Sequence, residues 1–233
     1  MSVTYPLGFR AAGVTAGFKP SGLPDLGLLV GEPGTTAAAL FTTNAVAAAP
    51  IEVGRDRLAR GRIRAVLVNS GQANAATGPR GVEDAIATSA EAASLLGAEP
   101  DEVLPSSTGV IGEPLHVDRM REAMPGLVDA LSTDGSESFA RAIMTTDTVH
   151  KQATTDAGAF RVGGCGGVPV AVGGVIPPAY FEPASPLAEE AAAAMKEAEI
   201  AVRVRLGDGP GSSRAFGCDL SYEYVRINGE YTT

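Results

Sequence analysis

The sequence predicts a layered α/β protein in which mixed β-sheets pack against helices. Short apolar runs typical of strands are interspersed with segments whose apolar residues recur at helical spacing. Gly-rich and Pro-rich turns separate several neighbouring runs, as in hairpins, which argues against a purely parallel sheet. With 233 residues, of which 45% are hydrophobic and 19% charged, the chain is long enough to bury a sizeable core.

The predicted strands of the first half are short and apolar. Leu26–Val30 and Ala37–Phe41 are two such runs, joined by the turn-rich segment GEPGTT. Ile63–Val68 is a continuous apolar run, which predicts a buried strand, and a loop rich in Gly, Asn and Ala follows it. A fourth strand is expected to end at Val103 and Leu104 and to open into a tight polar loop.

Three helices are predicted between these strands and the Gly-rich second half. The first spans Val82–Leu96, where apolar residues share one face, and Gly97 is expected to terminate it. The second covers Asp118–Leu131 and carries its methionines and leucines on one face. The third begins near Ser136, which is predicted to be its N-cap, and carries Phe139 on its apolar face.

The second half combines Gly-rich strands, an irregular segment and a terminal hairpin. Phe160–Val175 is read as two strands around a Gly-Gly turn. The segment IPPAYFEPASP contains too many prolines for regular structure. A short Ala-rich helix is predicted at Leu187–Ala198. Residues 200–206 and 216–224 alternate apolar and polar side chains, which predicts an antiparallel pair with one buried face.

The charge balance argues against nucleic-acid binding. The formal net charge is −9, whereas duplex binders need a basic face and single-strand binders need a basic groove with aromatic platforms. The densest basic run, Arg55–Arg64, contains no aromatic residue, and we interpret it as a solvated surface turn before a strand. We therefore expect no nucleic-acid partner.

The cysteines and the amino-terminal sequence indicate which cellular compartment and which cofactors to expect. Cys165 and Cys218 are too few for a disulfide framework, and no CxxC or His-rich spacing predicts a metal. No phosphate-binding glycine motif is present, so we expect no nucleotide cofactor. The start MSVTYPLGFR lacks the layout of a signal peptide, and no apolar stretch reaches about 18 residues. These features predict a cytoplasmic protein without a membrane partner.

Histidine is scarce, which limits the possible catalytic arrangements. A Ser-His-Asp or Cys-His arrangement would have to use His116, at a predicted helix start, or His150, in a polar loop. Neither lies in a GxSxG elbow or a known cysteine-nucleophile context. We interpret both as surface or capping residues.

Three hydroxyl-rich loops remain as candidates for a catalytic or binding site. They are 69–74 (NSGQAN), 106–109 (SSTG) and 145–148 (TTDT), and each follows an apolar segment from which a loop can converge on a site. A Thr-Gly step such as Thr108-Gly109 suits an oxyanion hole, because Gly permits an unusual backbone angle and Thr supplies a second donor. The alternative reading of such clusters is an ordinary turn.

Taken together, these loops resemble a known enzyme family. The segments GFRAAGVTAGFKPSGLPDLGLLV, VLVNSGQANAATG, LPSSTGVIG and IMTTDTVHK occur in the order seen in the first subunit of ornithine acetyltransferases. The terminal GCDLSYEYVRINGEYTT looks like the end of the second subunit. The resemblance implies an α/β sandwich similar to N-terminal-nucleophile hydrolases. It also implies ping-pong transfer of an acetyl group from N-acetylornithine to glutamate, in arginine biosynthesis.

The resemblance carries over to individual residues and to a division of the chain. Residues 1–176 form a first-subunit-like domain, 177–185 a Pro-rich junction, and 186–233 a helix and hairpin like the end of the second subunit. Thr108 and Gly109 match the family's oxyanion-hole pair. Thr145 or Thr146 matches a substrate-binding threonine, and Thr145 is the better match. Asn228 and Thr233 match substrate contacts near the carboxyl terminus.

The sequence departs from the family where the nucleophile is expected. After Val175 the family continues with a Lys-Gly segment and a self-cleavage motif Pro-x-Met-Ala-Thr-Met-Leu, whose Thr becomes the nucleophile. Here the sequence continues Ile176-Pro177-Pro178-Ala179-Tyr180. We therefore expect that the cleavage segment and most of the second subunit are missing. No nucleophile is assigned.

Two hypotheses follow from this departure. In the first, the protein is an acyltransferase with another nucleophile, such as Thr154, Ser106 or Ser107; an amide hydrolase would need one too. In the second, it is a catalytically inactive truncated relative that acts as a binding or partner protein. Loss of so much of a layered core should expose apolar surface, which favours oligomerisation or instability, and we expect a homo-oligomer.

Overall fold

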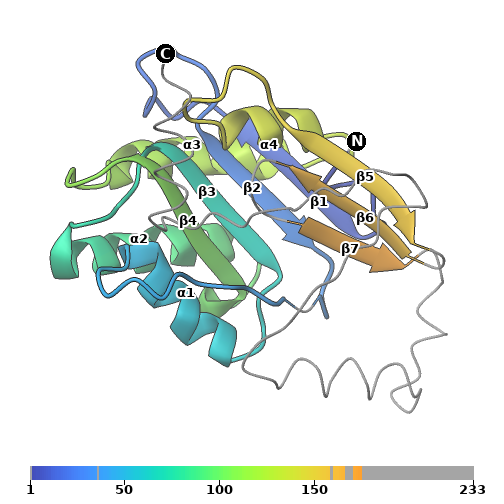
Figure 1. Cartoon of the computed structure of the whole chain (residues 1–233), viewed down its shortest axis with the longest axis horizontal. Coiled ribbons are helices and arrows are strands. Elements are labelled where there is room, and N and C mark those ends of the chain that lie inside the picture. The colour runs from blue at the N-terminus through green and yellow to red at the C-terminus, as the bar shows by residue number, and fades with distance from the viewer. Residues whose placement is uncertain (1, 36, 158–159, 166–169, 175–233) are drawn as a thin grey trace.

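The computed structural model describes residues 2–35, 37–157, 160–165 and 170–174, coloured in Figure 1. In chain order the elements are β1 (Phe9–Val14), β2 (Leu26–Gly31), α1 (Ala49–Ala59), β3 (Ala65–Gln72), α2 (Gly78–Leu95), a 3-10 turn η1 (Pro100–Glu102), β4 (Val103–Val110), α3 (Val117–Asp129), α4 (Ser136–Ala142), β5 (Gln152–Ala157), β6 (Phe160–Cys165) and β7 (Val170–Gly174).

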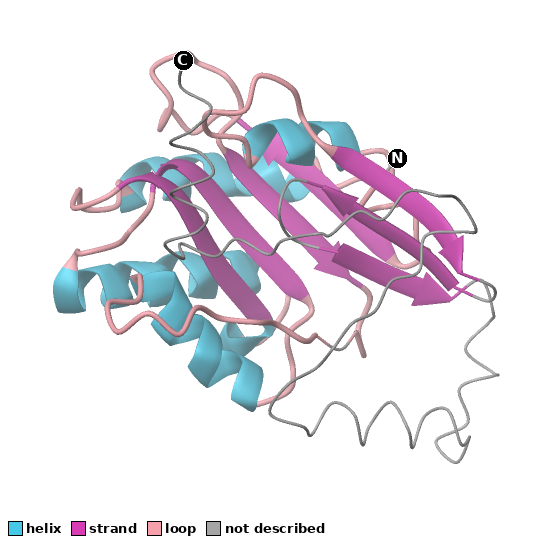
Figure 2. Cartoon of the chain, in the orientation of Figure 1, coloured by secondary structure: helices cyan, strands magenta, loops and turns pink. Residues whose placement is uncertain are grey.

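The strands form two sheets, shown in Figure 2. The larger sheet has the order β1-β2-β3-β4, with two antiparallel pairs and a parallel pair between β3 and β4. The smaller sheet has the order β5-β6-β7 and is antiparallel throughout. A parallel pair needs a long crossover, and α2 with η1 supplies it between β3 and β4. The mixed α/β prediction is confirmed.

Two hydrophobic cores on opposite faces of the larger sheet make the layers. On one face Leu28 and Leu67 pack with Met120 and Met124 of α3 and with alanines of α2. On the other face the core joins the larger sheet to α4 and to the smaller sheet, through Leu29, Val68, Phe139, Cys165 and Ala171. The order is therefore helices, sheet, then α4 with the second sheet, which confirms the layered sandwich (Figure 1).

Strand β2 is the centre of this arrangement. All six of its residues are buried, because alternate side chains enter opposite cores. Leu26 and Leu28 are fully buried, and each fully buried leucine stabilises the fold by about 1.5–3 kcal/mol. The short apolar run Leu26–Val30 predicted this strand, and its lack of alternation fits a strand covered on both faces.

Two glycines allow α4 to pack closely on the larger sheet. Gly13 of β1 pairs with Gly27 of β2. A Cβ on Gly13 would lie 2.0 Å from the Ser138 carbonyl oxygen, and one on Gly27 would lie 3.0 Å from the Phe139 ring. Side chains at these two positions would push α4 off the sheet, so the glycines set the depth at which Phe139 is buried.

Ser136 has a different role from the one predicted. The N-cap of α4 is Gly135, and no side-chain hydrogen bond caps the helix. The buried Ser136 hydroxyl instead accepts hydrogen bonds from the Ser2 and Thr4 amides at 2.9 and 3.2 Å. The amino-terminal segment needs these acceptors because its buried N–H groups lie outside any strand. Ser136 therefore anchors the start of the chain to α4.

Several predicted elements are confirmed and others are wrong. The three helices, β2, β3 and the pair β6 and β7 occur close to their predicted bounds, and Gly97 follows α2 with φ of +61°. Residues 37–41 have no regular structure, although a strand was predicted there, because no neighbouring strand pairs with them. β1 and β5 were not predicted. The first is interrupted by Gly and Ala, the second is polar, and partners in the sheet stabilise both.

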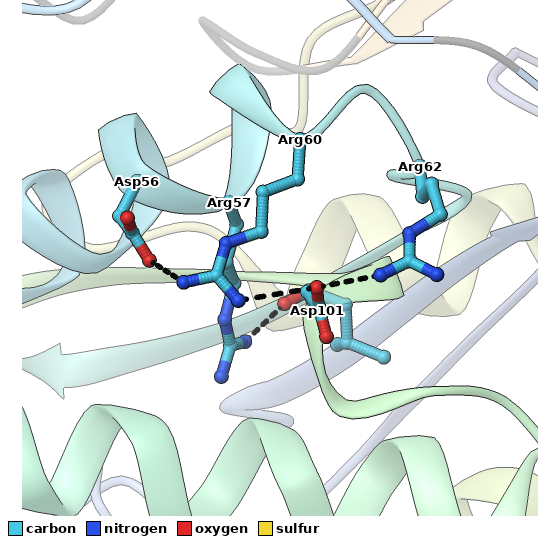
Figure 3. A network of polar contacts seen from close by, with 6 residues as sticks. Asp56, Arg57, Arg60, Arg62 and Asp101 are labelled. Carbon is cyan, nitrogen blue, oxygen red and sulfur yellow. Dashed lines mark hydrogen bonds and ion pairs between the residues drawn. The ribbon is translucent and has the colours of Figure 1, made fainter.

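Residues 60–64 of the arginine-rich run form the predicted turn before β3, but the first half of the run is the end of helix α1. Its last turn carries Arg57, which is 5% exposed and donates hydrogen bonds to the Ser89 hydroxyl at 2.6 Å and to the Val103 carbonyl oxygen. Figure 3 shows Arg60 between Asp56 and Asp101 in the neighbouring surface network. Charge alone predicted solvation, but Arg57 lies on the face of α1 that packs against α2 and β4.

The remaining predictions for the carboxyl-terminal part lie outside the described residues. These are the Pro-rich junction 177–185, the helix at 187–198 and the hairpin strands at 200–206 and 216–224, together with the site residues Asn228 and Thr233.

Candidate functional site

The predicted polar loop around Thr108 and Gly109 is part of a strand. β4 runs to Val110 and stays paired with β3, with Thr108 opposite Ser70 and Gly109 opposite Gly71. A loop was predicted because the side chains of β4 become polar after Leu104. That prediction was wrong, since β3 continues beside this part of β4 and pairs with it in parallel. The pairing becomes irregular at Gly71 and Gln72, where a bulge shifts the register.

Gly109 occupies a position that only glycine fits. Its φ is +133°, and a Cβ there would lie 2.2 Å from the carbonyl carbon of Gly71. Gly109 is exposed and Thr108 is half-buried. An exposed glycine backbone in an unusual conformation beside a threonine hydroxyl can supply two donors to an anionic oxygen. This geometry is compatible with the predicted oxyanion-hole pair.

A row of buried polar side chains lies at the carboxyl end of β3. Asn69, Ser70, Gln72 and Asn74 are between 0% and 4% exposed. The NSGQAN motif was singled out as hydroxyl-rich, but nothing in its pattern indicated that its side chains are buried. Buried polar groups need partners, and each of these four has one. The motif is therefore a buried polar segment, in which Asn69 and Gln72 bond to β4 and the chain that follows it, whereas Asn74 bonds to the start of α2.

Ser70 connects this end of the sheet to the segment that carries Thr145 and Thr146. Its hydroxyl donates a hydrogen bond to the carbonyl oxygen of Ala142, the last residue of α4. Thr145 and Thr146 follow three and four residues later and are both exposed. Since Ser70 is the register partner of Thr108, the structure ties the start of this loop to the strand end that carries the Thr-Gly pair.

Lys19 was not predicted as a site residue. Its ammonium donates to the Pro24 carbonyl oxygen at 2.6 Å and approaches the Arg141 and Ala142 carbonyl oxygens at 3.4 Å. Partial burial lowers the pKa of Lys19, and the nearby Asp25 carboxylate opposes that shift. A cation at the carboxyl end of α4 complements the helix dipole, so Lys19 supports the same helix end as Ser70.

Asp25 was also missed, and it shapes the loop beside Gly71. Its carboxylate is fully buried and accepts hydrogen bonds from the amides of Ala16, Phe18 and Lys19 at 2.6, 2.6 and 2.9 Å. These bonds fix Phe18, whose Cβ would lie 2.9 Å from a Cβ on Gly71. The only sequence signal was an Asp between Pro24 and an apolar strand, which also fits a turn.

The two histidines have the structural roles that were predicted. His116 is the N-cap residue of α3, its amide donates to the Gln72 side-chain oxygen at 3.0 Å, and its ring centroid lies 6.3 Å from that of Phe18. His150 lies in a loop, with its Nδ1 3.1 Å from the Gln152 side-chain nitrogen.

None of the suggested nucleophiles has a base in the contacts that the structure shows. The Ser107 hydroxyl donates to the Asn69 amide oxygen at 2.6 Å, and an amide oxygen is no general base. Ser106 and Thr154 are exposed on their strands. Among the residues that the structure describes, no group of three or more His, Cys, Asp or Glu could hold a metal ion, and no helix could span a membrane.

A cavity of about 410 Å³ lies away from this site. It is lined by residues of α1, α2 and η1, among them Arg57, Arg60, Ile86 and Asp101. Because η1 precedes β4, the cavity is next to the amino end of that strand, whereas Thr108 and Gly109 lie at the carboxyl end. The two features are therefore separate.

Comparisons with known proteins agree with the resemblance. A profile of the ArgJ family matches residues 10–176 and 169–233. The arginine biosynthesis bifunctional protein ArgJ of Thermosynechococcus vestitus is 49% identical over 167 residues, which cover 70% of this chain and 40% of that protein. The Streptomyces coelicolor protein of the same name is 47% identical over 165 residues, covering 70% of this chain and 43% of that protein. The chain thus spans about two fifths of the length of the curated relatives it matches.

Solved structures give the same result for the fold. An ornithine acetyltransferase of Mycobacterium tuberculosis, crystallised with ornithine, matches with a TM-score of 0.63 and 45% identity, over 65% of this chain and 82% of that chain. The arginine biosynthesis bifunctional protein ArgJ of Bacillus halodurans matches with a TM-score of 0.62 and 34% identity, over 78% of this chain and 93% of that chain. The fold, the ordered motifs and these matches together show that the chain belongs to the ArgJ family.

Proposed function

We propose that this protein acts in arginine biosynthesis, on the transfer of an acetyl group from N-acetylornithine to glutamate. The proposal is supported by relatives named arginine biosynthesis bifunctional protein and by a similar ornithine acetyltransferase crystallised with ornithine. The observation that carries it on this chain is the exposed, positive-φ Gly109 beside Thr108. We further propose the cytoplasm as the compartment.

The chemistry assigns a role to each matched residue. Thr108 and Gly109 would donate hydrogen bonds to the oxygen of the acetyl carbonyl as a nucleophile attacks it and negative charge develops there. Collapse of that intermediate releases ornithine and leaves the acetyl group on the nucleophile, from which the glutamate amine takes it. Thr145 or Thr146, together with Asn228 and Thr233, would bind the substrates.

The direct test is to follow acetyl transfer to labelled glutamate. The purified chain is incubated with N-acetylornithine and ¹³C-glutamate, and labelled N-acetylglutamate is measured by mass spectrometry. We expect product from the wild type and a loss of about 10²–10³-fold in Thr108→Val, which keeps the shape but removes one donor. Thr133→Val, at an exposed turn outside the candidate loops, is the matched control and should retain activity. Product formation at equal rates in all three proteins would contradict the assignment of Thr108.

A second function is favoured by one sequence observation. Residues 176–180 read IPPAY, in place of the Lys-Gly segment and Ala-Thr-Met-Leu step that supply the family nucleophile. This supports a protein that binds the substrates, or a full-length homologue, without turnover. Intact mass spectrometry after incubation with N-acetylornithine separates the two functions. An acetyl adduct on one Thr or Ser supports transfer, whereas an unchanged mass with measurable ligand binding supports the binding protein.

We also propose a homo-oligomer. The support is apolar surface: the side chains of Leu40 and Val46 in the segment before α1, and of Val110 and Ile111 at the end of β4, are between 52% and 82% exposed. Light scattering coupled to size exclusion would show a mass above 23.6 kDa if this is correct, and a monomer at all concentrations if it is not.

A further inference from the structure

We infer that Asn69 and Gln72 act as positioning residues, which together fix the backbone of β4 at Thr108 and Gly109. Neither residue is among those that the family resemblance assigned to the site. The inference rests on the proposed function only for its consequence for ligand binding. Its structural part stands on the hydrogen bonds of these two buried amides.

Asn69 fixes the strand just before the Thr-Gly pair. The Ser107 hydroxyl donates to its side-chain oxygen at 2.6 Å, and its side-chain nitrogen donates to the Gln72 main-chain oxygen at 2.8 Å. Asn69 is 1% exposed, so neither bond competes with bulk water. One side chain therefore joins Ser107 of β4 to the bulged end of β3.

Gln72 fixes the chain that follows β4, between the pair and α3. Its side-chain nitrogen donates to the Pro114 carbonyl oxygen at 3.1 Å, and its side-chain oxygen accepts from the His116 amide at 3.0 Å. Gln72 is itself held by Asn69 through its main-chain oxygen. The two amides thus hold the chain on both sides of Thr108 and Gly109, at Ser107 and at 114–116.

This arrangement explains why an exposed strand end can keep an unusual conformation. Gly109 has φ of +133° and is exposed, so packing of its own atoms against a core does not fix it. An oxyanion donor is useful only if its direction is set before the substrate arrives. The buried amides supply that preorganisation from beneath the strand, which is the role of a supporting shell around a binding site.

The chain offers a matched control in Asn74. It is also fully buried, it accepts a hydrogen bond from the Thr77 hydroxyl at 2.8 Å, and it donates one to the Gly81 carbonyl oxygen at 2.8 Å. Its bonds hold the start of α2 and do not reach β4. Asn69→Asp and Asn74→Asp therefore make the same chemical change at two different places. Each puts a carboxyl oxygen where an amide nitrogen donated to a main-chain carbonyl oxygen.

The experiment compares these variants in the full chain by two readouts. The first is the amide signals of Thr108 and Gly109 in a ¹⁵N-¹H spectrum. The second is the affinity for N-acetylornithine, measured by calorimetry, with thermal stability measured alongside. We expect Asn69→Asp and Gln72→Glu to shift both amide signals and to weaken binding about tenfold, which corresponds to the loss of roughly one hydrogen bond's contribution. Asn74→Asp should leave the signals and the affinity unchanged, even where it lowers stability equally.

Each outcome decides something. Unmoved Thr108 and Gly109 signals in Asn69→Asp would overturn the inference, as would equal shifts in the Asn74→Asp control. If Asn69→Asp does not fold, Ser107→Ala can be used instead. It removes the hydrogen bond between Ser107 and Asn69 at the half-buried Ser107 and should give the same signal changes. If the wild type does not bind N-acetylornithine while the signals shift as expected, the positioning role stands and the proposed function fails.

Discussion

Gly71 and Gly109 face each other across the parallel pair β3–β4, and both adopt positive φ angles, of +122° and +133°. A Cβ on Gly109 would lie 2.2 Å from the Gly71 carbonyl carbon and 2.6 Å from the Gln72 nitrogen. A Cβ on Gly71 would in turn press on Phe18. The two strand ends approach this closely only because both residues lack a side chain.

We predict that Gly109→Ala displaces the end of β4 and costs more than backbone strain alone. The strain of a side-chain-bearing residue at such a φ is about 1–3 kcal/mol, and the overlap with Gly71 adds to it. Gly112→Ala is the control, since Gly112 also has a positive φ, of +86°, but has no atom within 4 Å of its Cβ position. Urea unfolding should show a larger loss of stability for Gly109→Ala. Equal losses would mean that the close approach to Gly71 is unimportant.

We predict that Asp25→Ala lowers the free energy of unfolding by about 3 kcal/mol. The substitution leaves three buried or partly buried amides without their acceptor. Hydrogen bonds to charged groups make a net contribution of about 1.5–3 kcal/mol each, and water that enters the vacated space recovers part of that sum. The measurement is chemical denaturation followed by circular dichroism. Asp118→Ala, at a side chain that is 94% exposed, should change the stability little. A similar result for both variants would contradict a structural role for the Asp25 carboxylate.

We predict that Arg57→Ala destabilises the protein by about 2–3 kcal/mol, because it leaves the Ser89 hydroxyl and the Val103 carbonyl oxygen short of a donor and opens a cavity beneath α1. Arg60→Ala removes two ion pairs of a side chain that is 53% exposed, shown in Figure 3, and should cost only a small fraction of that. Thermal denaturation ranks the two. The opposite ranking would show that the surface network matters more than the buried guanidinium.

We predict that Cys165 is unreactive in the folded protein. Burial raises the pKa of its thiol from 9.0 to about 12, so the nucleophilic thiolate is scarce at pH 8. Iodoacetamide labelling with peptide mapping should modify Cys165 only in denaturant. The same shift makes stability fall as the pH rises above about 9, because the unfolded chain then loses a proton that the folded chain retains. Cys165→Ala should weaken that pH dependence, and an unchanged slope would refute the link.

The sequence by itself determined the class of the fold, most of its elements and the family. Periodicity located both α2 and α3, because helical spacing is a local property of the chain. It also gave the buried face of α3, but not that of α2, where Ile86 is exposed and small residues such as Ala85 and Ala92 face the core. The continuous apolar run was sufficient for β2. The Thr108-Gly109 step was recognisable because its chemistry is carried by two adjacent residues.

Only the tertiary structure decided the rest, since it depends on partners far away in the sequence. β1 and β5 are strands because neighbouring strands pair with them, and residues 37–41 are not a strand because none does. Arg57 was interpreted as part of a solvated turn and Asn69 as part of a polar loop, and both are buried against side-chain partners 32 and 38 residues away. Hydrogen bonds between distant segments leave no periodic pattern in a sequence, so the support beneath the Thr-Gly pair became visible only in three dimensions.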